Sequence, residues 1–346
     1  GIAWGGFNVT EGGGDSAEVA LELMPGNKIR KYDTWHAMGQ GATTGSLVVT
    51  LEALKEMHLT PEDIQLIQND TKTCPDTGMA GASRSLYMDG NATIIAANKL
   101  LAAMRKEDGT LRTYDEMKAE GIETKYLGRY ETNTTPGLCR LDPNTGIGDP
   151  TPAFTYCLNL AEVEVDTKTG KTTVLKFTCV DFVGRIGNID AVNGQAYSGI
   201  MHGIGFALKE DYADVKKHAN MFGAGTSYIK DVPDDINLIH IDGAISDGPF
   251  GSSGASEAFQ ASGHCAVLNG IYNACGVRIH EIPALPEKVK AGLDAIAKGE
   301  KPYEPKKYFL GSDMYEELEN IKENPVQVGT QSFYVSLDDP TAERPF

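Results

Sequence analysis

The 346-residue sequence predicts an α+β protein built from two mixed subdomains, in which sheets pack against helices. The first observation behind this prediction is a mixture of hairpins and separated helices. Segments in which apolar residues alternate are followed by segments with apolar residues at helical spacing. The second is a set of loops rich in small residues, each of which opens a predicted helix. Together these patterns indicate packed helices and sheets that present several exposed backbone loops.

The first predicted subdomain covers residues 1–150. Its strands alternate apolar and polar residues, and its helices repeat apolar residues every three or four positions. The predicted elements are a strand at 17–23, a helix at 44–58 that Pro61 stops, a short strand at 63–67, and an alanine-rich helix at 91–105. Residues 106–152 are polar and rich in turn residues, so we expect a long excursion there.

The second predicted subdomain covers residues 151–300. It begins with the clearest hairpin of the chain, whose strands at 158–165 and 172–182 are joined by a turn at 166–170. The helices predicted after it lie at residues 195–211, 257–275 and 288–297. The glycines within 195–211 are too many for a free helix and indicate close packing or a nearby ligand. Residues 301–346 form a polar, proline-containing tail.

Composition limits the possible partners. The net charge of −17 and the pI near 4.8 argue against nucleic acid and anionic membrane as partners, and no 18-residue apolar stretch predicts a membrane span. An anionic cofactor must therefore be held by backbone amides and a few local donors. The six cysteines are scattered, without zinc or iron–sulfur spacing, so we expect reduced thiols in a cytoplasmic protein.

The chain starts with Gly1 and shows neither a basic region nor an apolar segment typical of a signal peptide. We therefore expect a fragment, a processed product, or a subunit separated from a longer ancestor. If the protein is a redox enzyme, its electrons must leave through a centre on another chain or another part of the chain.

The most informative segment is the small-residue loop at 247–257, which ends at Glu257 beside Ala258 and Phe259. Small residues let the backbone approach a ligand, and successive amides can form an anion-binding nest. A carboxylate behind such a nest is suited to proton transfer. The alternative is an ordinary helix start, in which Ser256 caps the helix and Glu257 meets the helix dipole.

Three further segments share this character. A Gly-Gln-Gly turn lies at 39–41, a loop of small residues at 77–85 contains Arg84 as a cation for phosphate or carboxylate, and Asn188 and Gln195 offer amide groups. Each has a plain alternative as a tight turn or a helix cap. Several amide-rich loops together indicate an extended ligand with phosphates in more than one place.

Together these segments resemble the molybdenum-binding region of the xanthine oxidase family, and most closely its bacterial molybdenum aldehyde oxidoreductases. The matching positions reach to about residue 295 and resemble the second half of that region. Three of the matches begin with short motifs: Gly-Gln-Gly at 39–41, Gly-Ala-Ser-Arg at 81–84 followed by 90–92, and Gly-Gln at 194–195 followed by 203–205. The other matches are the longer segments 247–257, 271–278 and 283–288. One departure is Ala255-Ser256-Glu257, where the family commonly has Val-Gly-Glu.

The resemblance implies a molybdenum-cofactor-binding domain that holds a molybdopterin dinucleotide, in bacteria usually the cytosine form. It implies that Glu257 is the general base. It also implies that the pterin dithiolene holds molybdenum without a direct protein ligand. The implied cofactor-binding residues are Gly39, Gln40, Gly41, Ala80, Gly81, Ala82, Ser83, Arg84, Ser85, Asn188, Gln195, Ser253, Gly254, Ala255 and Ser256.

The activity implied is oxidation of an aldehyde to a carboxylic acid with oxygen derived from water, by a molybdenum-binding subunit or fragment. Two alternatives stay open: a hydroxylase of N-heterocycles of the purine or nicotinate kind, and a non-catalytic cofactor-holding subunit. The resemblance also implies partners. A chain carrying the first half of the molybdenum site would complete the site, and iron–sulfur clusters and FAD on partner chains would take the electrons.

Overall fold

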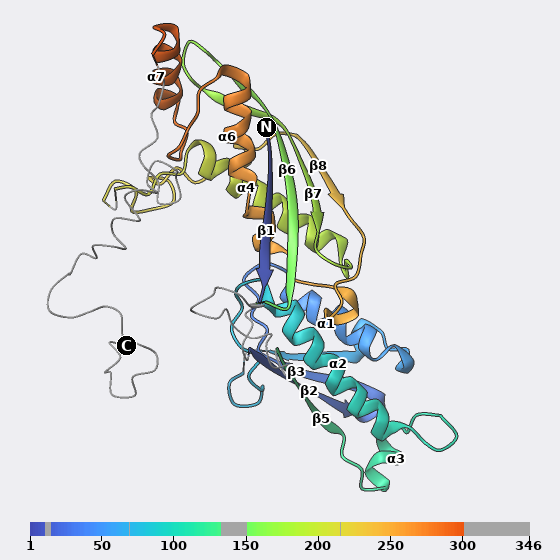
Figure 1. The fold of residues 1–346 in the computed structure, drawn as a ribbon. Helices are drawn as coiled ribbons and strands as arrows, with labels where there is room; N and C mark the ends of the chain where they lie inside the picture. Colours follow the sequence, from blue (N-terminus) through green and yellow to red (C-terminus); the bar gives the residue numbers. More distant parts are fainter. Residues whose placement is uncertain (11–14, 69, 133–150, 215, 301–346) are drawn as a thin grey trace, which may run out of the picture.

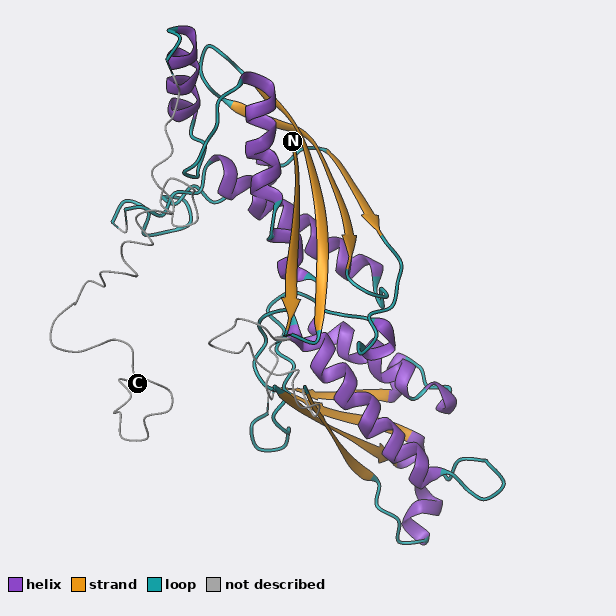
Figure 2. Ribbon diagram, in the orientation of Figure 1, coloured by secondary structure: helices purple, strands orange, loops and turns teal. Residues whose placement is uncertain are grey.

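Two four-stranded mixed sheets organise the chain, and each is packed against helices (Figures 1 and 2). The structure is a computed structural model. It describes residues 1–10, 15–68, 70–132, 151–214 and 216–300. The expected tail at 301–346 and the last part of the expected excursion, 133–150, lie outside the described residues.

The first sheet has the strand order β4-β3-β2-β5, in which β3 and β4 are parallel and the other pairs are antiparallel. Helices α1 and α2 pack against it and enclose a core of aliphatic side chains. Its strands are β2 (Ser16–Met24), β3 (Lys28–Asp33), β4 (Ile64–Gln68) and β5 (Lys125–Glu131). Its helices are α1 (Ala42–Ala53), α2 (Arg84–Met104) and α3 (Tyr114–Ala119), with short 3-10 turns at Pro25–Asn27, Lys55–Met57 and Pro61–Asp63.

The second sheet has the order β1-β6-β7-β8, in which β7 and β8 are parallel and the other pairs are antiparallel. Its inner face packs against α4, α5 and α6 around the buried side chains of Phe177, Ile200 and Phe259. Its strands are β1 (Ile2–Val9), β6 (Ala153–Val165), β7 (Thr172–Phe182) and β8 (Asp235–His240). The helices are α4 (Ile189–Leu208), α5 (Ser256–Gln260), α6 (Gly263–Cys275) and α7 (Pro286–Ala297), with 3-10 turns at Ile229–Asp231 and Pro249–Gly251.

The two sheets do not divide the chain at residue 150. Strand β1 pairs with β6 along its whole length, from Ile2 opposite Leu160 to Val9 opposite Ala153. The beginning of the described chain therefore belongs to the second sheet. The expected excursion after residue 106 also contains ordered structure, because it holds α3 and the strand β5, which pairs with β2.

The predicted hairpin, the strand at 17–23 and the strand at 63–67 are confirmed as β6-β7, β2 and β4. The single helix predicted at 257–275 is wrong, because the structure has α5 and α6 with a break at Ala261 and Ser262. Ser262 leaves the helical conformation, and its hydroxyl accepts a hydrogen bond from Asn159 Nδ2 at 2.9 Å. The break lets Gly263 lie directly against Gly203 of α4.

Close contact with neighbouring helices explains Gly199 and Gly203 of α4. A Cβ atom built on Gly199 would lie 2.5 Å from the Cβ of Phe259, and one on Gly203 would lie 3.0 Å from the Cα of Gly263. No larger side chain fits at these crossings without displacing a neighbouring helix. Of the two explanations that the sequence left open, close helix packing accounts for both positions.

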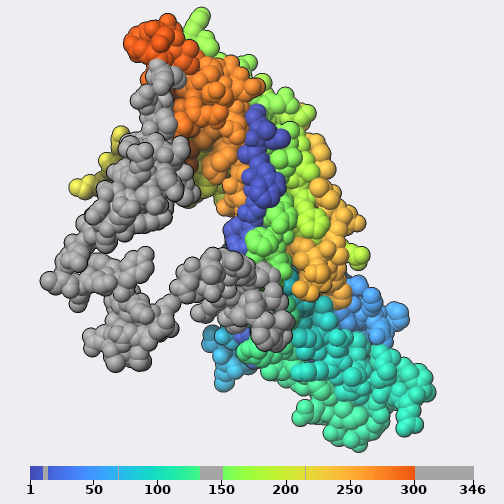
Figure 3. Space-filling model, in the orientation of Figure 1, coloured from blue at the N-terminus to red at the C-terminus, as the bar shows by residue number. Residues whose placement is uncertain are grey.

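The outer face of the second sheet carries several exposed apolar side chains, and in Figure 3 no described element covers its strands. Its outward side chains include Trp4 of β1 with Phe154 and Tyr156 of β6, and Trp4 and Tyr156 stack with ring centroids 5.7 Å apart. Trp4 is 66% exposed. Within the described residues, no helix has the length and apolar character needed to cross a membrane.

Candidate functional site

A cleft of about 740 Å³ lies where the helices of the first sheet meet the loops of the second. Its volume is in the range of small-molecule and cofactor sites. Four separated parts of the chain form its walls: the loop before α1 with α1 itself, the segment that leads into α2, the segment that leads into α4, and residues 249–257 with α5. These are the same segments that the sequence singled out.

Most of the predicted site residues line this cleft. They are Gln40, Gly41, Ala80, Gly81, Ser83, Ser85, Asn188, Gln195, Ser253, Gly254, Ala255, Ser256 and Glu257. Gly39, Ala82 and Arg84 do not line it. The fold therefore gathers into one cleft residues that the sequence places far apart.

Arg84 has a structural role that its sequence context did not indicate. Its side chain is buried, and its guanidinium pairs with the carboxylate of Asp15 through Nε at 2.6 Å and Nη2 at 2.8 Å. The remaining N–H groups donate to the backbone carbonyls of Ser16, Thr77 and Met79. A guanidinium has five donors, and all are used here. Of the two partners that the sequence suggested, phosphate and carboxylate, the structure shows the carboxylate of Asp15, which leaves no side-chain N–H of Arg84 for a ligand.

Glu257 stands at the start of α5 and faces Ser83, which precedes α2. The Ser83 hydroxyl donates to Glu257 Oε2, and the Glu257 backbone N–H donates to Ser83 Oγ at 3.4 Å. Ser256 does not cap α5; its hydroxyl instead donates to Gln195 Oε1 at 2.9 Å. The plain interpretation of Ser256 as a helix cap is therefore wrong, and its hydroxyl joins α5 to α4.

Two of the predicted amide side chains bond within their own loops. Gln40 accepts from Met38 N and donates through Nε2 to His36 O at 2.7 Å, which closes the turn before α1. Asn188 is the N-cap of α4, because its Oδ1 accepts from Ala191 N at 2.9 Å. For Asn188 the capping alternative is realised, although the residue also lines the cleft.

The cleft has one feature that points to a bound ligand. Ser253 is 5% exposed and its Oγ has no hydrogen-bond partner among the described residues, so a buried polar atom at the cleft wall is left for a ligand. The residues present therefore fit a cofactor that is bound through polar backbone and side-chain contacts.

Arg185 is a charged cleft residue that the sequence analysis missed. Among the described residues that line the cleft, it alone has a positively charged side chain. Its backbone N–H donates to Gly251 O at 2.9 Å, and Gly184 forms a β-bridge with Ser252. This main-chain clamp holds the segment before α4 against the loop before α5. The sequence gives no local signal for Arg185, because its place in the cleft depends on this pairing with residues far along the chain.

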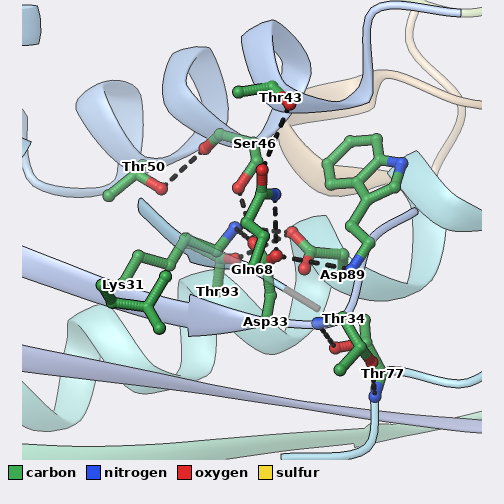
Figure 4. A network of polar contacts seen from close by, with 12 residues as sticks. Lys31, Asp33, Thr34, Thr43, Ser46, Thr50, Gln68, Thr77, Asp89 and Thr93 are labelled. Atoms are coloured by element: carbon green, nitrogen blue, oxygen red, sulfur yellow. Dashed lines mark hydrogen bonds and ion pairs between the residues drawn. The ribbon is translucent and has the colours of Figure 1, made fainter. Parts of the chain in front are cut away.

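A buried polar network supports the wall made by α1 (Figure 4). Lys31 and Asp33 of β3 and Asp89 of α2 are fully buried, and Lys31 Nζ lies 2.6 Å from Asp89 Oδ1 and 3.3 Å from Asp33 Oδ2. Asp33 accepts from Ser46 Oγ of α1 at 2.6 Å and from Gln68 Nε2 at 2.8 Å. Burial raises the pKa of Asp89 to about 6, although Lys31 opposes the shift.

A second network holds α4. His240 of β8 places Nδ1 2.7 Å from Asp181 Oδ2 and Nε2 2.8 Å from Asn193 Oδ1, so one imidazole joins β7, β8 and α4. Burial raises the pKa of Asp181, and the neighbouring His240 opposes this shift. The helix that contributes Asn188 and Gln195 to the cleft is therefore fixed to the sheet by polar as well as apolar contacts.

Known proteins are similar to this chain in sequence and in fold. Residues 1–233 match the family model of the molybdopterin cofactor-binding domain. The aldehyde oxidoreductase of Megalodesulfovibrio gigas is 40% identical over 295 residues, which cover 85% of this chain and 32% of that protein. A probable hypoxanthine oxidase of Escherichia coli strain K12 is 28% identical over 75% of this chain and 29% of its own.

The crystal structure of the aldehyde oxidoreductase from Desulfovibrio desulfuricans ATCC 27774 superposes on this chain with a TM-score of 0.80 and 43% identity. The superposition covers 84% of this chain and 32% of that one, so the chain spans about a third of the length of the relatives it matches. The resemblance drawn from the sequence motifs is confirmed. The chain belongs to the molybdopterin cofactor-binding domain family, within the xanthine oxidase family of molybdenum hydroxylases.

Proposed function

We propose that this chain is the part of a molybdenum hydroxylase that holds a molybdopterin dinucleotide and supplies Glu257 as general base. The reaction is oxidation of an aldehyde to a carboxylic acid with oxygen derived from water. The observation that carries the proposal is the cleft, in which Glu257 meets the loops around Gln40, Ser83, Gln195 and Ser253. The 40% identity to an aldehyde oxidoreductase supports the choice of substrate class.

When bound, the cofactor supplies the redox centre that accepts the two electrons of the oxidation. Gly41, Gly81 and Ser253 line the cleft and would hold the cofactor through backbone amides and the unpaired hydroxyl of Ser253. Arg185 would offset part of the negative charge of the phosphates, which the acidic chain as a whole repels. We propose the cytosine form of the dinucleotide and a cytoplasmic location for the enzyme.

Glu257 is placed to accept a proton. Its Oε2 accepts the hydrogen bond of Ser83, so Oε1 is the oxygen that would take the proton from the water-derived nucleophile. The buried residues Ala258 and Phe259 follow it and limit the access of bulk water from the side of α5. The protein's own contribution is therefore to position a base and to exclude solvent.

We propose that the remaining functions lie outside these residues. A further segment or a partner chain would complete the molybdenum site, and iron–sulfur clusters with FAD would carry the electrons away. The coverage of about a third of each relative supports this arrangement, because most of each relative's length has no counterpart here.

Replacing Glu257 with Gln tests the base. We expect Glu257→Gln to lower kcat in the complete enzyme by about 10²-fold or more, because amides do not accept the proton. Molybdenum content should stay unchanged. The matched control is Glu52→Gln, which changes another carboxylate that lines the cleft and should retain activity. Near-normal turnover of Glu257→Gln would refute the assignment.

Oxidation of an N-heterocycle is the second candidate, since a probable hypoxanthine oxidase is among the relatives. Assays of the complete enzyme against aldehydes, purines and nicotinate separate the two. A kcat/KM for a heterocycle above that for every aldehyde would transfer the proposal to that class. Molybdenum below about a tenth of an equivalent per enzyme would instead favour a non-catalytic subunit, because a functional site retains its cofactor tightly.

A further inference from the structure

Ser83 makes the direct side-chain hydrogen bond to the Glu257 carboxylate. The Ser83 hydroxyl donates to Oε2, and Ser83 Oγ accepts a hydrogen bond from the Glu257 backbone N–H at 3.4 Å. The contact joins residues that are 174 positions apart, from the start of α2 and the start of α5. One hydroxyl therefore contacts both the backbone and the side chain of the proposed base.

The backbone, rather than a flexible side chain, sets this contact. Ala82 and Ser83 both have φ of 49°, in the left-handed region that residues with a side chain rarely adopt. Such conformations persist where the surrounding structure imposes them, and they gather at functional sites. Gly254 supplies part of that constraint, because a Cβ at this position would lie 1.7 Å from Ser83 O. The two loops are thus locked together next to Glu257.

The contact also has a geometric consequence. A hydrogen bond to one carboxylate oxygen fixes the orientation of the group, and a general base must lie within hydrogen-bond reach of the proton that it takes. Among the predicted cofactor-binding residues, Ser83 is the one for which the structure gives a hydrogen bond to Glu257, and both residues line the cleft. Its neighbour Ser85 lines the same cleft without a hydrogen bond to Glu257.

We propose that Ser83 is a positioning residue for the base. Its hydroxyl fixes Oε2 of Glu257, so that Oε1 is presented to the reacting water. This inference rests on the proposed role of Glu257. It gives Ser83 a function beyond the binding of cofactor that the family resemblance implied.

The experiment uses the complete enzyme with Ser83→Gly, because glycine adopts φ of 49° freely and only the hydroxymethyl group is lost. We expect kcat to fall by about tenfold or more while the KM for the aldehyde stays unchanged, because a base that is no longer held in place is poorly oriented toward the reacting water. Molybdenum content per enzyme should equal that of the wild type. Ser83→Ala should give the same fall in kcat, which would assign the effect to the hydroxyl.

Ser246→Ala is the comparison variant, because Ser246 is exposed and does not line the cleft, and its kcat should equal that of the wild type. An unchanged kcat in Ser83→Gly, or a loss of molybdenum with an unchanged kcat in the loaded fraction, would overturn the proposal and make Ser83 a cofactor ligand only. In a Glu257→Gln background, Ser83→Gly should lower residual turnover no further. If Glu257→Gln itself retains turnover, the proposed function fails; if Glu257→Gln is inactive and the kcat of Ser83→Gly is unchanged, only this inference fails.

Discussion

At the scale of single residues, Asp89 shows how burial and ion pairing oppose each other. Its carboxylate is fully buried beside Lys31, yet its Oδ2 has no hydrogen-bond partner among the described residues. Desolvation is the larger effect and raises the pKa to about 6 from an ordinary 3.8. Because the folded pKa lies above the unfolded one, the folded state binds the proton more tightly than the unfolded state does.

This shift predicts a pH dependence of stability. The contribution of Asp89 to the free energy of unfolding is fully present below pH 3.8 and is lost as the pH rises through about 6. Relative to Asp89→Asn, the wild type should lose on the order of 3 kcal/mol of unfolding free energy between about pH 4 and pH 7. Urea unfolding of both proteins at a series of pH values measures this difference.

Asp70→Asn is the control of opposite sign. Hydrogen bonds from Thr73 and Lys72 lower the pKa of Asp70, so its contribution is present at neutral pH and is lost on acidification. The stability difference between wild type and Asp70→Asn should therefore grow as the pH rises. Equal pH profiles for wild type and Asp89→Asn would contradict the assignment for Asp89.

At the scale of elements, the contact between α4 and α5 depends on Gly199. A Cβ at this position would lie 2.5 Å from Phe259 Cβ and 2.8 Å from its backbone carbon. We expect Gly199→Ala to lower the free energy of unfolding by about 1–3 kcal/mol, as overpacked cores do. Turnover should also fall, because α5 contains Glu257. Thermal unfolding together with the aldehyde assay measures both effects.

Gly194 of the same helix is the matched control. No atom lies within 4 Å of a Cβ built there, so Gly194→Ala should raise stability by up to about 1 kcal/mol through helix propensity alone. If both substitutions changed stability in the same direction and by the same amount, close packing of α4 would not explain the glycines.

Elements with a strong local signal were predictable from the sequence. The hairpin β6-β7 has alternating apolar residues and a clear turn, and the structure agrees with both strands. The edge strands β5 and β8 and the partner β1 were not predicted, because long-range pairing and not local pattern defines them. The break at Ser262 was missed because Asn159, on a distant strand, stabilises it.

The same distinction holds for the cleft. Its small-residue loops and Glu257 were visible in the sequence because their composition is unusual. The hydrogen bond between Ser83 and Glu257 and the clamp on Arg185 were not, since both join segments far apart in the chain. Arg84 was placed in the site by its charge and by the family resemblance, and the structure shows that its carboxylate partner is Asp15.

At the scale of the whole molecule, the second sheet has two apolar faces. One packs on helices, and the other exposes Ile2, Trp4 and Phe154, which are 55%, 66% and 43% exposed. Exposed apolar surfaces of this kind mark interaction sites or lead to aggregation. We expect the isolated chain to self-associate, and the double variant Trp4→Thr with Phe154→Thr to reduce this. Light scattering over a range of concentrations measures it.

Ile229→Thr is the control for that experiment. Ile229 is 88% exposed but lies in a 3-10 turn away from the sheet, so its replacement should leave self-association unchanged. A wild-type chain that stays monomeric at high concentration would show that the sheet face does not drive association.

The pairing of β1 with β6 has a consequence for how the chain reaches this fold. The whole of the first sheet, with its helices, lies between these two strands in the sequence. During synthesis from the ribosome, the first sheet can assemble while β1 still waits for its partner to emerge. Contacts between residues so far apart in the sequence form slowly. We therefore expect a chaperone to bind the exposed apolar side chains of β1 until β6 has been synthesised.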